Sequence, residues 1–496
     1  MRGLEIGLLV LYGLGLLFIL SYSVIQIYLV IKYNKRKKLG PKEWSPMHEL
    51  PKVTVQLPLY NELYVVERLI ESILKFDYPK ELLEVQILDD STDETTQIVV
   101  GSIAPYLAQG FQIEHIRRED RSGFKAGALA VGMQKAHGEF IAIFDADFLP
   151  HPDFLQKMIL PFRDEKVGCV QSKWQDINAD FSLLTKLQAF GLDAHFSVEQ
   201  GGRNEAGHFI NFNGTAGVWR KTTIEDAGGW QSDTLTEDLD LSYRAQLKGW
   251  QFVYREDVGA PAELPAEMNA LKTQQFRWTK GAAECARKNL GKVLVAKNLS
   301  LGTKLNAIFH LMNSAVFISI VLISVLSVPI LFIKQANESY AWIFKVGSIF
   351  ILTLPILGTF YWTSIINQYA KKTIAFKHFM VLFPFFLSVS MGLSLHNALA
   401  VIEGYIGKKT PFIRTPKFNL TNNKNQSWRA NVYLTRSIGL LTVIELALAI
   451  YFLAAIYVGF RFEDYGLLPF HLLLVFGFGF VSLKSIIHLF KINQLA

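Results

Sequence analysis

Hydrophobic positions along the chain follow two different patterns. Residues 6–31 and 305–490 carry long apolar runs, whereas residues 40–300 alternate short β-rich runs with stretches of helical spacing. An apolar run of about 20 residues is long enough to cross the hydrocarbon core of a membrane as a helix. The chain is therefore predicted to be an α/β domain inserted between transmembrane helices. The predicted parts are an N-terminal anchor at 1–35, the domain at 45–290 and a C-terminal membrane part at 291–496.

Four nearly continuous apolar runs indicate buried strands within the predicted domain. They are VTVQL at 53–57, EVQIL at 84–88, FQIEHI at 111–116 and FIAIF at 140–144, with helical spacing between them at 62–75, 93–108 and 125–137. Strands that alternate with helices imply a mostly parallel sheet with helices on both faces. Ligands of such sheets bind beyond the carboxyl ends of the strands, so the residues that follow each strand carry the functional information. After the first strand these include Tyr60 and Glu62, at a rim where a nucleotide could bind.

The later apolar runs predict further membrane crossings. These runs lie at 305–333, 346–368, 438–459 and 466–487. Basic residues follow the first run at 32–42 and recur at 408–436, and such residues mark the cytoplasmic side. We therefore expect the N-terminus outside and the domain in the cytoplasm. Because both flanks of 378–404 have cytoplasmic character, we interpret this run as interfacial or re-entrant, with five crossings; six crossings is the alternative.

Composition excludes several classes of protein. Half of the 496 residues are hydrophobic, 19% are charged and the mean hydropathy is +0.23, which excludes a disordered, collagenous or disulfide-stapled chain. Cys169 and Cys285 are too few for a disulfide framework or a four-ligand zinc site. The formal charge of +7 lies beside the apolar runs, so we expect no nucleic-acid partner. No Walker A or Rossmann glycine pattern follows the strands, which disfavours a P-loop or NAD enzyme.

Acidic residues follow two of the predicted strands. Asp145 and Asp147 come directly after FIAIF, and side chains two apart in extended backbone point the same way. Two such carboxylates suit a hard divalent cation that also binds phosphate oxygens, although solvated turn acids are the alternative for an isolated D-x-D. Asp89 and Asp90 end another strand, where a carboxylate can accept a hydrogen bond from a base N–H. Capping of the next helix by residues 91–93 is the competing interpretation.

Two later segments contain residue types that serve group-transfer chemistry. The sequence TED at 236–238 precedes an apolar helical run, where helix capping and a general base at Asp238 are both reasonable interpretations. Gln274, Arg277 and Trp278 share one face of a predicted helix. Arg277 can neutralise a diphosphate and Trp278 can stack on a sugar. The alternative is an interfacial helix anchored in the membrane by Trp and Arg.

Four motifs, in their order and spacing, resemble those of the processive family 2 glycosyltransferases, the group of cellulose, hyaluronan and chitin synthases. The motifs are Asp90, D-x-D at 145–147, TED at 236–238 and QQFRW at 274–278. The surrounding text, including QLPLYNE, KAGAL, AIFDADF, HFSVEQ, FNGTAGVWR and TEDLDLSYRAQLKGW, is similar to the plant cellulose-synthase-like A and C proteins, which make mannan and glucan backbones. The resemblance is dense over 45–290. It implies a GT-A fold and inverting transfer of a hexose from a cytoplasmic nucleotide-sugar to a β-linked polysaccharide: β-1,4-mannan, glucomannan or glucan. It also implies export through the membrane part.

The resemblance implies roles for individual positions of this chain. Asp90, Asp89 and Tyr60 are expected to contact the base, Lys125 the phosphates, and Asp145 and Asp147 an Mg²⁺ or Mn²⁺ ion. Asp238 is expected to be the general base, with Arg277 and Gln274 at the leaving group. Trp278, Asn213, Gly214 and Thr215 are expected to contact the acceptor, although cellulose synthases have Cys at the position of Asn213. Phe412, Arg414, Thr415 and Lys417, within a loop at 408–420, resemble the cellulose-synthase gating loop, from which Arg414 and Pro416 depart.

Other functions stay open at the level of sequence. GDP-mannose and UDP-glucose both fit as donors, and we expect a glycan acceptor, the lipid bilayer and accessory export subunits as partners. The alternatives are a single-transfer enzyme acting on ceramide or a polyprenyl phosphate, a transporter or channel with a regulatory domain, and an inactive scaffold of an export complex. Polar residues interrupt the apolar runs at His310, Asn313, His396 and Asn397. They either line a path for polymer or form hydrogen bonds between helices.

Overall fold

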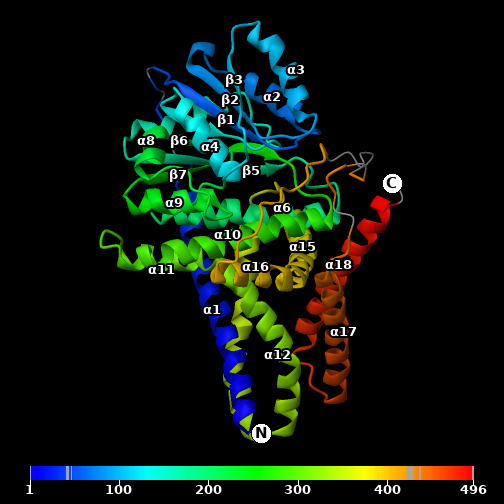
Figure 1. Ribbon diagram of the computed structural model, residues 1–496. Coiled ribbons are helices and arrows are strands. Elements are labelled where there is room, and N and C mark those ends of the chain that lie inside the picture. The colour runs from blue at the N-terminus through cyan, green and yellow to red at the C-terminus, as the bar shows by residue number, and fades with distance from the viewer. Residues whose placement is uncertain are drawn as a thin grey trace.

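The computed structural model describes residues 2–40, 44–45, 47, 49–421, 428–429, 431–434 and 437–493. Of the basic residues that mark the expected cytoplasmic side, Lys42, Lys424 and Arg436 lie outside the described residues. The molecule has a sheet-containing domain at one end and a bundle of long helices that extends away from it (Figure 1). The chain enters and leaves the sheet domain from the helical end, so the domain is inserted between the long helices, as the hydrophobic pattern predicts.

Seven strands in the described part of the chain form one sheet in the order β3-β2-β1-β4-β6-β5-β7. Their bounds are β1 Val53–Leu59, β2 Leu83–Asp89, β3 Gln112–Arg117, β4 Phe140–Ile143, β5 Val167–Asp176, β6 Gly217–Arg220 and β7 Gln251–Ala262. Only β6 runs antiparallel to its neighbours among these pairings. The mostly parallel sheet and the four predicted strands are thus confirmed. Nearly all residues of β1 and β2 are buried because both faces of the sheet are covered there, whereas the edge strand β3 is more exposed.

Helices flank the sheet and connect its strands. They are α2 Val66–Leu74, α3 Thr95–Leu107, α4 Phe124–Lys135, α5 Phe154–Met158, α6 Leu183–Ala194, α7 Gln200–Glu205, α8 Lys221–Asp226, α9 Glu237–Leu247 and α10 Met268–Val295. A π-helical turn, His195–Glu199, joins α6 to α7. The three helices predicted between the first strands are α2, α3 and α4, each shorter than its hydrophobic pattern. The long α10 runs beneath the sheet, where the domain meets the bundle (Figure 1).

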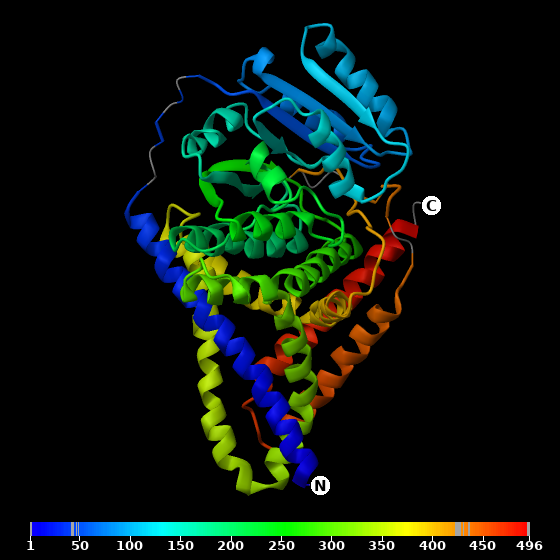
Figure 2. The ribbon, with the colours of Figure 1, turned by 60° about the vertical axis from the view of Figure 1, so that its left-hand side comes forward.

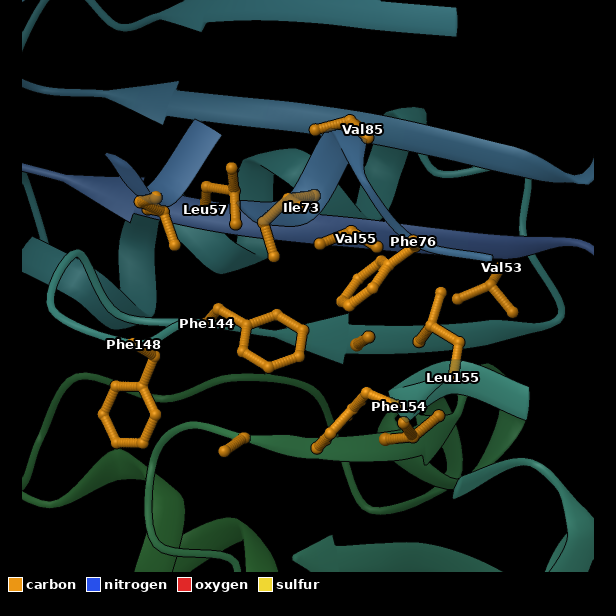
Figure 3. Packing of buried hydrophobic residues seen from close by; sticks show 14 of the residues in the cluster. Val53, Val55, Leu57, Ile73, Phe76, Val85, Phe144, Phe148, Phe154 and Leu155 are labelled. Carbon is orange, nitrogen blue, oxygen red and sulfur yellow. The ribbon is translucent and has the colours of Figure 1, made fainter. Parts of the chain in front are cut away.

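One large hydrophobic core holds the first strands in place. Val55 and Leu57 of β1 are fully buried, and Phe144 after β4 packs edge-on against Phe154 of α5 at a ring distance of 5.1 Å (Figure 3). Complete burial of a side chain of this kind stabilises a fold by roughly 1.5–3 kcal/mol. The carboxyl ends of β1, β2 and β4 are therefore held side by side, and the polar residues that follow them share one edge of the sheet.

The bundle contains the remaining helices. They are α1 Arg2–Lys38, α11 Leu301–Leu311, α12 Val316–Ala336, α13 Ala341–Gly347, α14 Thr353–Ile365, α15 Lys372–Gly392, α16 Ser394–Ile406, α17 Leu440–Arg461 and α18 Leu468–Asn493. Among the described residues, six helical segments are long and apolar enough to cross a membrane. These segments are Arg2–Lys38, Asn313–Ala336, Glu338–Ile365, Lys372–Gly392, Leu440–Arg461 and Leu468–Ile492. Their number supports a multi-pass membrane protein.

Two of the predicted spans differ from the structure in their shape. The run 305–333 is divided by a 3₁₀ turn, Asn313–Ala315, so that α11 runs alongside α10 and only α12 is of spanning length (Figure 1). Hydropathy averaged over a window does not register such a turn. The run 378–404 is likewise two helices, of which α16 lies directly beneath α10 (Figures 1 and 2). Because 372–392 is also apolar enough to span, five crossings stays a prediction.

Candidate active site

A cavity of about 180 Å³ opens beyond the carboxyl ends of the central strands, between the sheet and α10. Nearly all residues predicted for the site line this cavity. They are Tyr60, Glu62, Asp90, Lys125, Asp145, Asp147, Asn213, Gly214, Asp238, Gln274, Arg277, Trp278, Phe412, Arg414, Thr415 and Lys417. Asp89 and Thr215 do not line it. Segments that lie far apart in the sequence therefore converge on one cavity.

Asp89 lies outside the cavity and has a structural position. Its side chain is buried and accepts hydrogen bonds from the Ser91 N–H, Thr96 Oγ1 and His115 Nε2 at 2.9, 2.8 and 3.0 Å. Burial alone would raise the pKa of Asp89, but these hydrogen bonds outweigh it and lower the pKa to about 2. Asp89 thus stabilises the turn after β2, and that turn directs Asp90 into the cavity.

Asp90 is held by an arginine that the sequence interpretation missed. Arg118 donates from Nε and Nη2 to the two carboxylate oxygens of Asp90 at 2.9 and 2.5 Å. The guanidinium of Arg121 lies over the Tyr60 ring at 3.3 Å from its centroid. Both arginines come just after β3, so their position after a strand was a usable signal. Of these residues, Asp90, Tyr60 and Arg121 line the cavity, and Arg118 supports Asp90 from outside it.

Asp145 and Asp147 follow β4 on adjoining walls of the cavity. Thr215 is buried behind them, and its Oγ1 accepts a hydrogen bond from the Asp145 N–H at 2.9 Å, so it positions the acidic turn rather than facing an acceptor. Lys125 Nζ lies 2.5 Å from Asp145 Oδ1, and Lys417 Nζ lies 2.7 Å from Asp147 Oδ2. Each carboxylate of the D-x-D pair therefore has its own ammonium partner.

The same pair has the features of an incomplete cation site. Asp147 Oδ1 is buried and has no hydrogen-bond partner among the described residues, although burial of an unpaired carboxylate oxygen is costly. No cluster of three or more His, Cys, Asp or Glu side chains that could enclose a metal occurs in the described ranges. A hard divalent cation takes oxygen ligands and often completes its shell with phosphate and water oxygens. Asp145 and Asp147 therefore fit a cation that enters with a phosphate ligand.

Asp238 lies at the start of α9 and faces the middle of the cavity. Thr236 provides no side-chain cap for this helix, so capping does not explain the TED sequence. Burial and the neighbouring Glu237 carboxylate raise the pKa of Asp238 to about 7, while Lys125 acts in the opposite direction. Gly214, with φ +81°, leaves room here, since an added Cβ would lie 3.1 Å from Asp238 Oδ2. A buried carboxyl group with a pKa near neutrality is suited to accept a proton.

Helix α10 forms the lower wall of the cavity with Gln274, Arg277 and Trp278. Arg277 Nη2 donates to Thr415 Oγ1 at 3.0 Å, and its guanidinium lies 4.6 Å from the centroid of the Phe412 ring. Trp278 lies 6.5 Å from Trp174, an aromatic residue of β5 that also lines the cavity and was not predicted. Helix α10 borders the bundle, as the interpretation as an interfacial helix requires. Its Gln274, Arg277 and Trp278 side chains nevertheless line the cavity, so they are not membrane anchors.

The loop at 408–420 has no regular secondary structure and covers one side of the cavity. The Phe412 ring stacks on Phe124 at 5.7 Å, and the guanidinium of Arg414 lies 2.7 Å from Glu62 Oε1. Burial raises the pKa of Glu62 to about 7, although Arg414 reduces the effect. The four residues predicted in this loop are therefore brought to the site.

A second cavity, of about 390 Å³, adjoins the first on the side of the bundle. Gln274 and Trp278 line both cavities, so Trp278 stands between them. His310 and Asn313 line the second cavity, although His310 Nδ1 is also 2.9 Å from Tyr243 Oη. His396, in contrast, lies 3.0 Å from the Lys272 carbonyl oxygen and forms a contact between helices. Polar groups thus continue from the first cavity towards the bundle.

Comparisons with known proteins match a large part of the chain. The family model described as "Glycosyltransferase like family 2" matches residues 51–281. Probable glucomannan 4-beta-mannosyltransferase 3 of Oryza sativa subsp. japonica is 36% identical over 387 residues, which are 76% of this chain and 67% of that protein. Glucomannan 4-beta-mannosyltransferase 7 of Arabidopsis thaliana is 39% identical over 292 residues, 56% of this chain and 52% of that protein. The chain spans about half the length of several such relatives.

A solved structure shares the fold of the chain. It is a mannosyltransferase from Pyrobaculum calidifontis in complex with GDP-Man and Mn²⁺, which covers 80% of this chain and 100% of its own at a TM-score of 0.53. The sequence identity between the two is 17%, so the likeness concerns the fold alone.

Proposed function

Since this chain belongs to glycosyltransferase family 2 and has the GT-A fold expected from its motifs, we propose that it polymerises a β-linked polysaccharide from a nucleotide-sugar. The observation that carries the proposal is the convergence of Asp90, the D-x-D pair, Asp238 and the Arg277–Trp278 face on one cavity. A β-1,4-mannan or glucomannan is the favoured product because the relatives are glucomannan 4-beta-mannosyltransferases; a glucan is the second candidate.

The donor binds on the sheet side of the cavity. Asp90 accepts hydrogen bonds from the base and Tyr60 lies beside it, while Lys125 and Arg277 contact the diphosphate. GDP-mannose is the favoured donor because the relatives are glucomannan 4-beta-mannosyltransferases; UDP-glucose stays the alternative. An Mg²⁺ or Mn²⁺ ion held by Asp145 and Asp147 would neutralise charge that develops on the leaving diphosphate.

Transfer requires an acceptor hydroxyl opposite the leaving group. Asp238 takes the proton of this hydroxyl while its oxygen forms a bond to the anomeric carbon, and the bond from that carbon to the diphosphate breaks. The configuration of the sugar is inverted because attack and departure occur on opposite faces. Burial and the neighbouring Glu237 carboxylate raise the pKa of Asp238 towards neutrality, which supports this role because a more basic carboxylate accepts a proton more readily.

The acceptor lies on the side of the cavity where Trp278, Asn213 and Gly214 are exposed to it. Trp278 can stack on the apolar face of a sugar, as aromatic side chains do through their broad surface. The second cavity continues beyond Trp278 towards the bundle, and its polar lining at His195, Asn211 and Asn313 suits a glycan. We therefore propose that the product leaves through the bundle, with the domain in the cytoplasm and the N-terminus outside.

The test is a product assay with the full chain in membranes. Labelled GDP-mannose and UDP-glucose are supplied separately with Mn²⁺ or Mg²⁺, and polymer is digested with a β-1,4-mannanase or a β-1,4-glucanase. We expect label from GDP-mannose in polymer that the mannanase releases. Label only in the lipid fraction would replace the proposal with single transfer to a lipid. Absence of turnover with every donor would favour a transporter or a scaffold. Membranes that contain Asp238→Asn at equal abundance are the matched control.

A further inference from the structure

The cation position of the proposed site is contacted by a side chain from a distant loop. Lys417 Nζ lies 2.7 Å from Asp147 Oδ2, and both side chains are largely buried. Asp147 itself is only 3% exposed. The other oxygen, Asp147 Oδ1, has no hydrogen-bond partner among the described residues. The ammonium group of Lys417 therefore pairs with one oxygen of the Asp147 carboxylate and leaves the other oxygen available to a cation.

Neighbouring contacts hold Lys417 at this position. On one side of it, Thr415 accepts a hydrogen bond from Arg277 at 3.0 Å. On the other side, the Phe418 N–H donates to Glu263 Oε1 at 2.8 Å. Because Glu263 also binds Arg68 at 2.8 Å, the loop is fastened to the domain on both sides of Lys417. The contact between Lys417 and Asp147 belongs to an ordered segment and not to a freely moving lysine.

We propose that Lys417 controls the loading of the cation site, by holding Asp147 until a nucleotide diphosphate arrives. The inference rests on the proposed function and names a regulation of that same site. A lone divalent cation must displace an ammonium group and then remain beside it, which like charges oppose. A diphosphate gives Lys417 a new anionic partner, so that the cation and the nucleotide enter together.

The proposal predicts opposite effects of one variant on two affinities. Lys417→Met removes the charge and keeps the apolar stem, so Mn²⁺ alone should bind about tenfold more tightly, as loss of a nearby like charge allows. The same variant should bind GDP in the presence of Mn²⁺ more weakly, because a phosphate partner is lost. Lys417→Arg keeps the charge. Its affinity for Mn²⁺ alone and its affinity for GDP in the presence of Mn²⁺ should both stay close to those of the unchanged chain.

The measurement uses the purified full chain in detergent. Free Mn²⁺ is titrated by electron paramagnetic resonance, and GDP binding is measured with and without Mn²⁺ by equilibrium dialysis. Lys135→Met is the matched control, since Lys135 forms an ion pair of the same 2.7 Å length with Glu114 outside the cavity. Lys417→Met combined with Asp147→Asn should lose the additional Mn²⁺ affinity, which places the ion at this carboxylate.

An unchanged or weaker affinity of Lys417→Met for Mn²⁺ alone would overturn the proposal, whatever happens to GDP. Loss of GDP binding without a gain in Mn²⁺ affinity would mean that the loop only covers the nucleotide. Failure of the proposed function looks different, since the unchanged chain would then bind neither GDP nor UDP at any Mn²⁺ concentration. Coincident thermal unfolding curves of Lys417→Met and Lys417→Arg show that both variants are folded.

Discussion

Gly281 of α10 lies so close to Thr236, at the start of α9, that a Cβ added to Gly281 would be 2.5 Å from Thr236 Cγ2. Two further contacts join the same segments: Glu284 accepts a hydrogen bond from the Leu235 N–H at 2.7 Å, and Cys285 Sγ lies 3.3 Å from Thr236 Oγ1. This close packing determines how far the proposed base stands from the Arg277–Trp278 face, because the two groups are carried by the two packed helices.

Gly281→Ala should therefore impair transfer without contacting any ligand. Overpacking of this kind costs about 1–3 kcal/mol of stability, and relief by movement of α9 would displace Asp238. We expect a lower melting temperature and a transfer rate reduced at least about tenfold, with GDP affinity retained. Gly291→Ala, in the same helix but with nothing within 4 Å of an added Cβ, is the control and should transfer normally. Equal behaviour of the two variants would contradict this account of the packing.

The pH dependence of transfer should report Asp238. Because burial and Glu237 raise the pKa of Asp238 to about 7, the carboxyl group is protonated and inactive as a base below that value. The rate constant kcat/KM should rise about tenfold per pH unit below pH ~7 and level off above it. Asp238→Asn should abolish transfer at every pH and leave nucleotide binding nearly unchanged. A profile that is flat from pH 5.5 to 8, or loss of nucleotide binding in folded Asp238→Asn, would remove the base assignment.

Removal of divalent cations should stop transfer reversibly. Asp145 and Asp147 supply only part of the ligand shell of the cation, so a chelator can remove it. A chelator is therefore expected to abolish activity, and added Mn²⁺ or Mg²⁺ to restore it. Asp145→Asn should raise the Mn²⁺ concentration for half-maximal activity at least about tenfold, as loss of one charged ligand implies. Asp153→Asn is the matched control, since Asp153 forms an exposed ion pair with Lys157 outside the cavity. Full activity after exhaustive chelation would rule out the cation.

Substitution of Trp278 should separate acceptor binding from donor binding. Trp278→Ala removes the stacking face between the two cavities, and we expect the acceptor KM to rise about tenfold while GDP affinity stays constant. Trp278→Phe keeps an aromatic face and should recover part of the loss. Short oligosaccharide acceptors and equilibrium GDP binding provide the two measurements. A parallel loss of donor affinity would instead make Trp278 a structural support of Arg277.

A buried ion pair connects α10 to the bundle, and its loss should lower stability. Lys272 Nζ lies 2.6 Å from Glu445 Oε2 of α17, with both side chains almost fully buried. Glu445→Leu leaves the lysine charge unpaired, which typically costs about 3–5 kcal/mol. Removing both charges in Lys272→Met with Glu445→Leu should recover much of this loss. Thermal unfolding in detergent measures both variants, and additive losses would show that the two residues do not act as a pair.

Local patterns were sufficient for much of this molecule. The runs VTVQL, EVQIL, FQIEHI and FIAIF became β1 to β4 because short runs rich in β-branched and other apolar residues favour strands, both in the buried β1, β2 and β4 and in the more exposed edge strand β3. The residues that follow them lie at the cavity because parallel strands end at one edge. The sequence pattern does not distinguish Asp89 from Asp90, because both come directly after the run EVQIL. Only the contacts of Asp89 with His115 and Thr96 show that its side chain is enclosed and does not face the cavity.

Arg118, Arg121 and Trp174 went unnoticed for a related reason. The position of Arg118 and Arg121 just after β3 was a usable signal, but their partners Asp90 and Tyr60 follow other strands, and no local pattern marks Trp174 within β5. The turn that separates α11 from α12 was not predicted, because averaged hydropathy contains no information on the direction of the backbone. These features depend on contacts between residues that are distant in the sequence.

The amino-acid sequence by itself determined the two-part organisation, the mostly parallel sheet and the acidic and aromatic residues that the site uses, because periodicity and residue chemistry are local properties. Only the tertiary structure decided that Asp90 faces the cavity while Asp89 is enclosed, that Thr236 rests on Gly281, and that Lys417 reaches Asp147. Lys417 and Asp147 are 270 positions apart, and their contact exists only because the loop after α16 returns to the edge of the sheet.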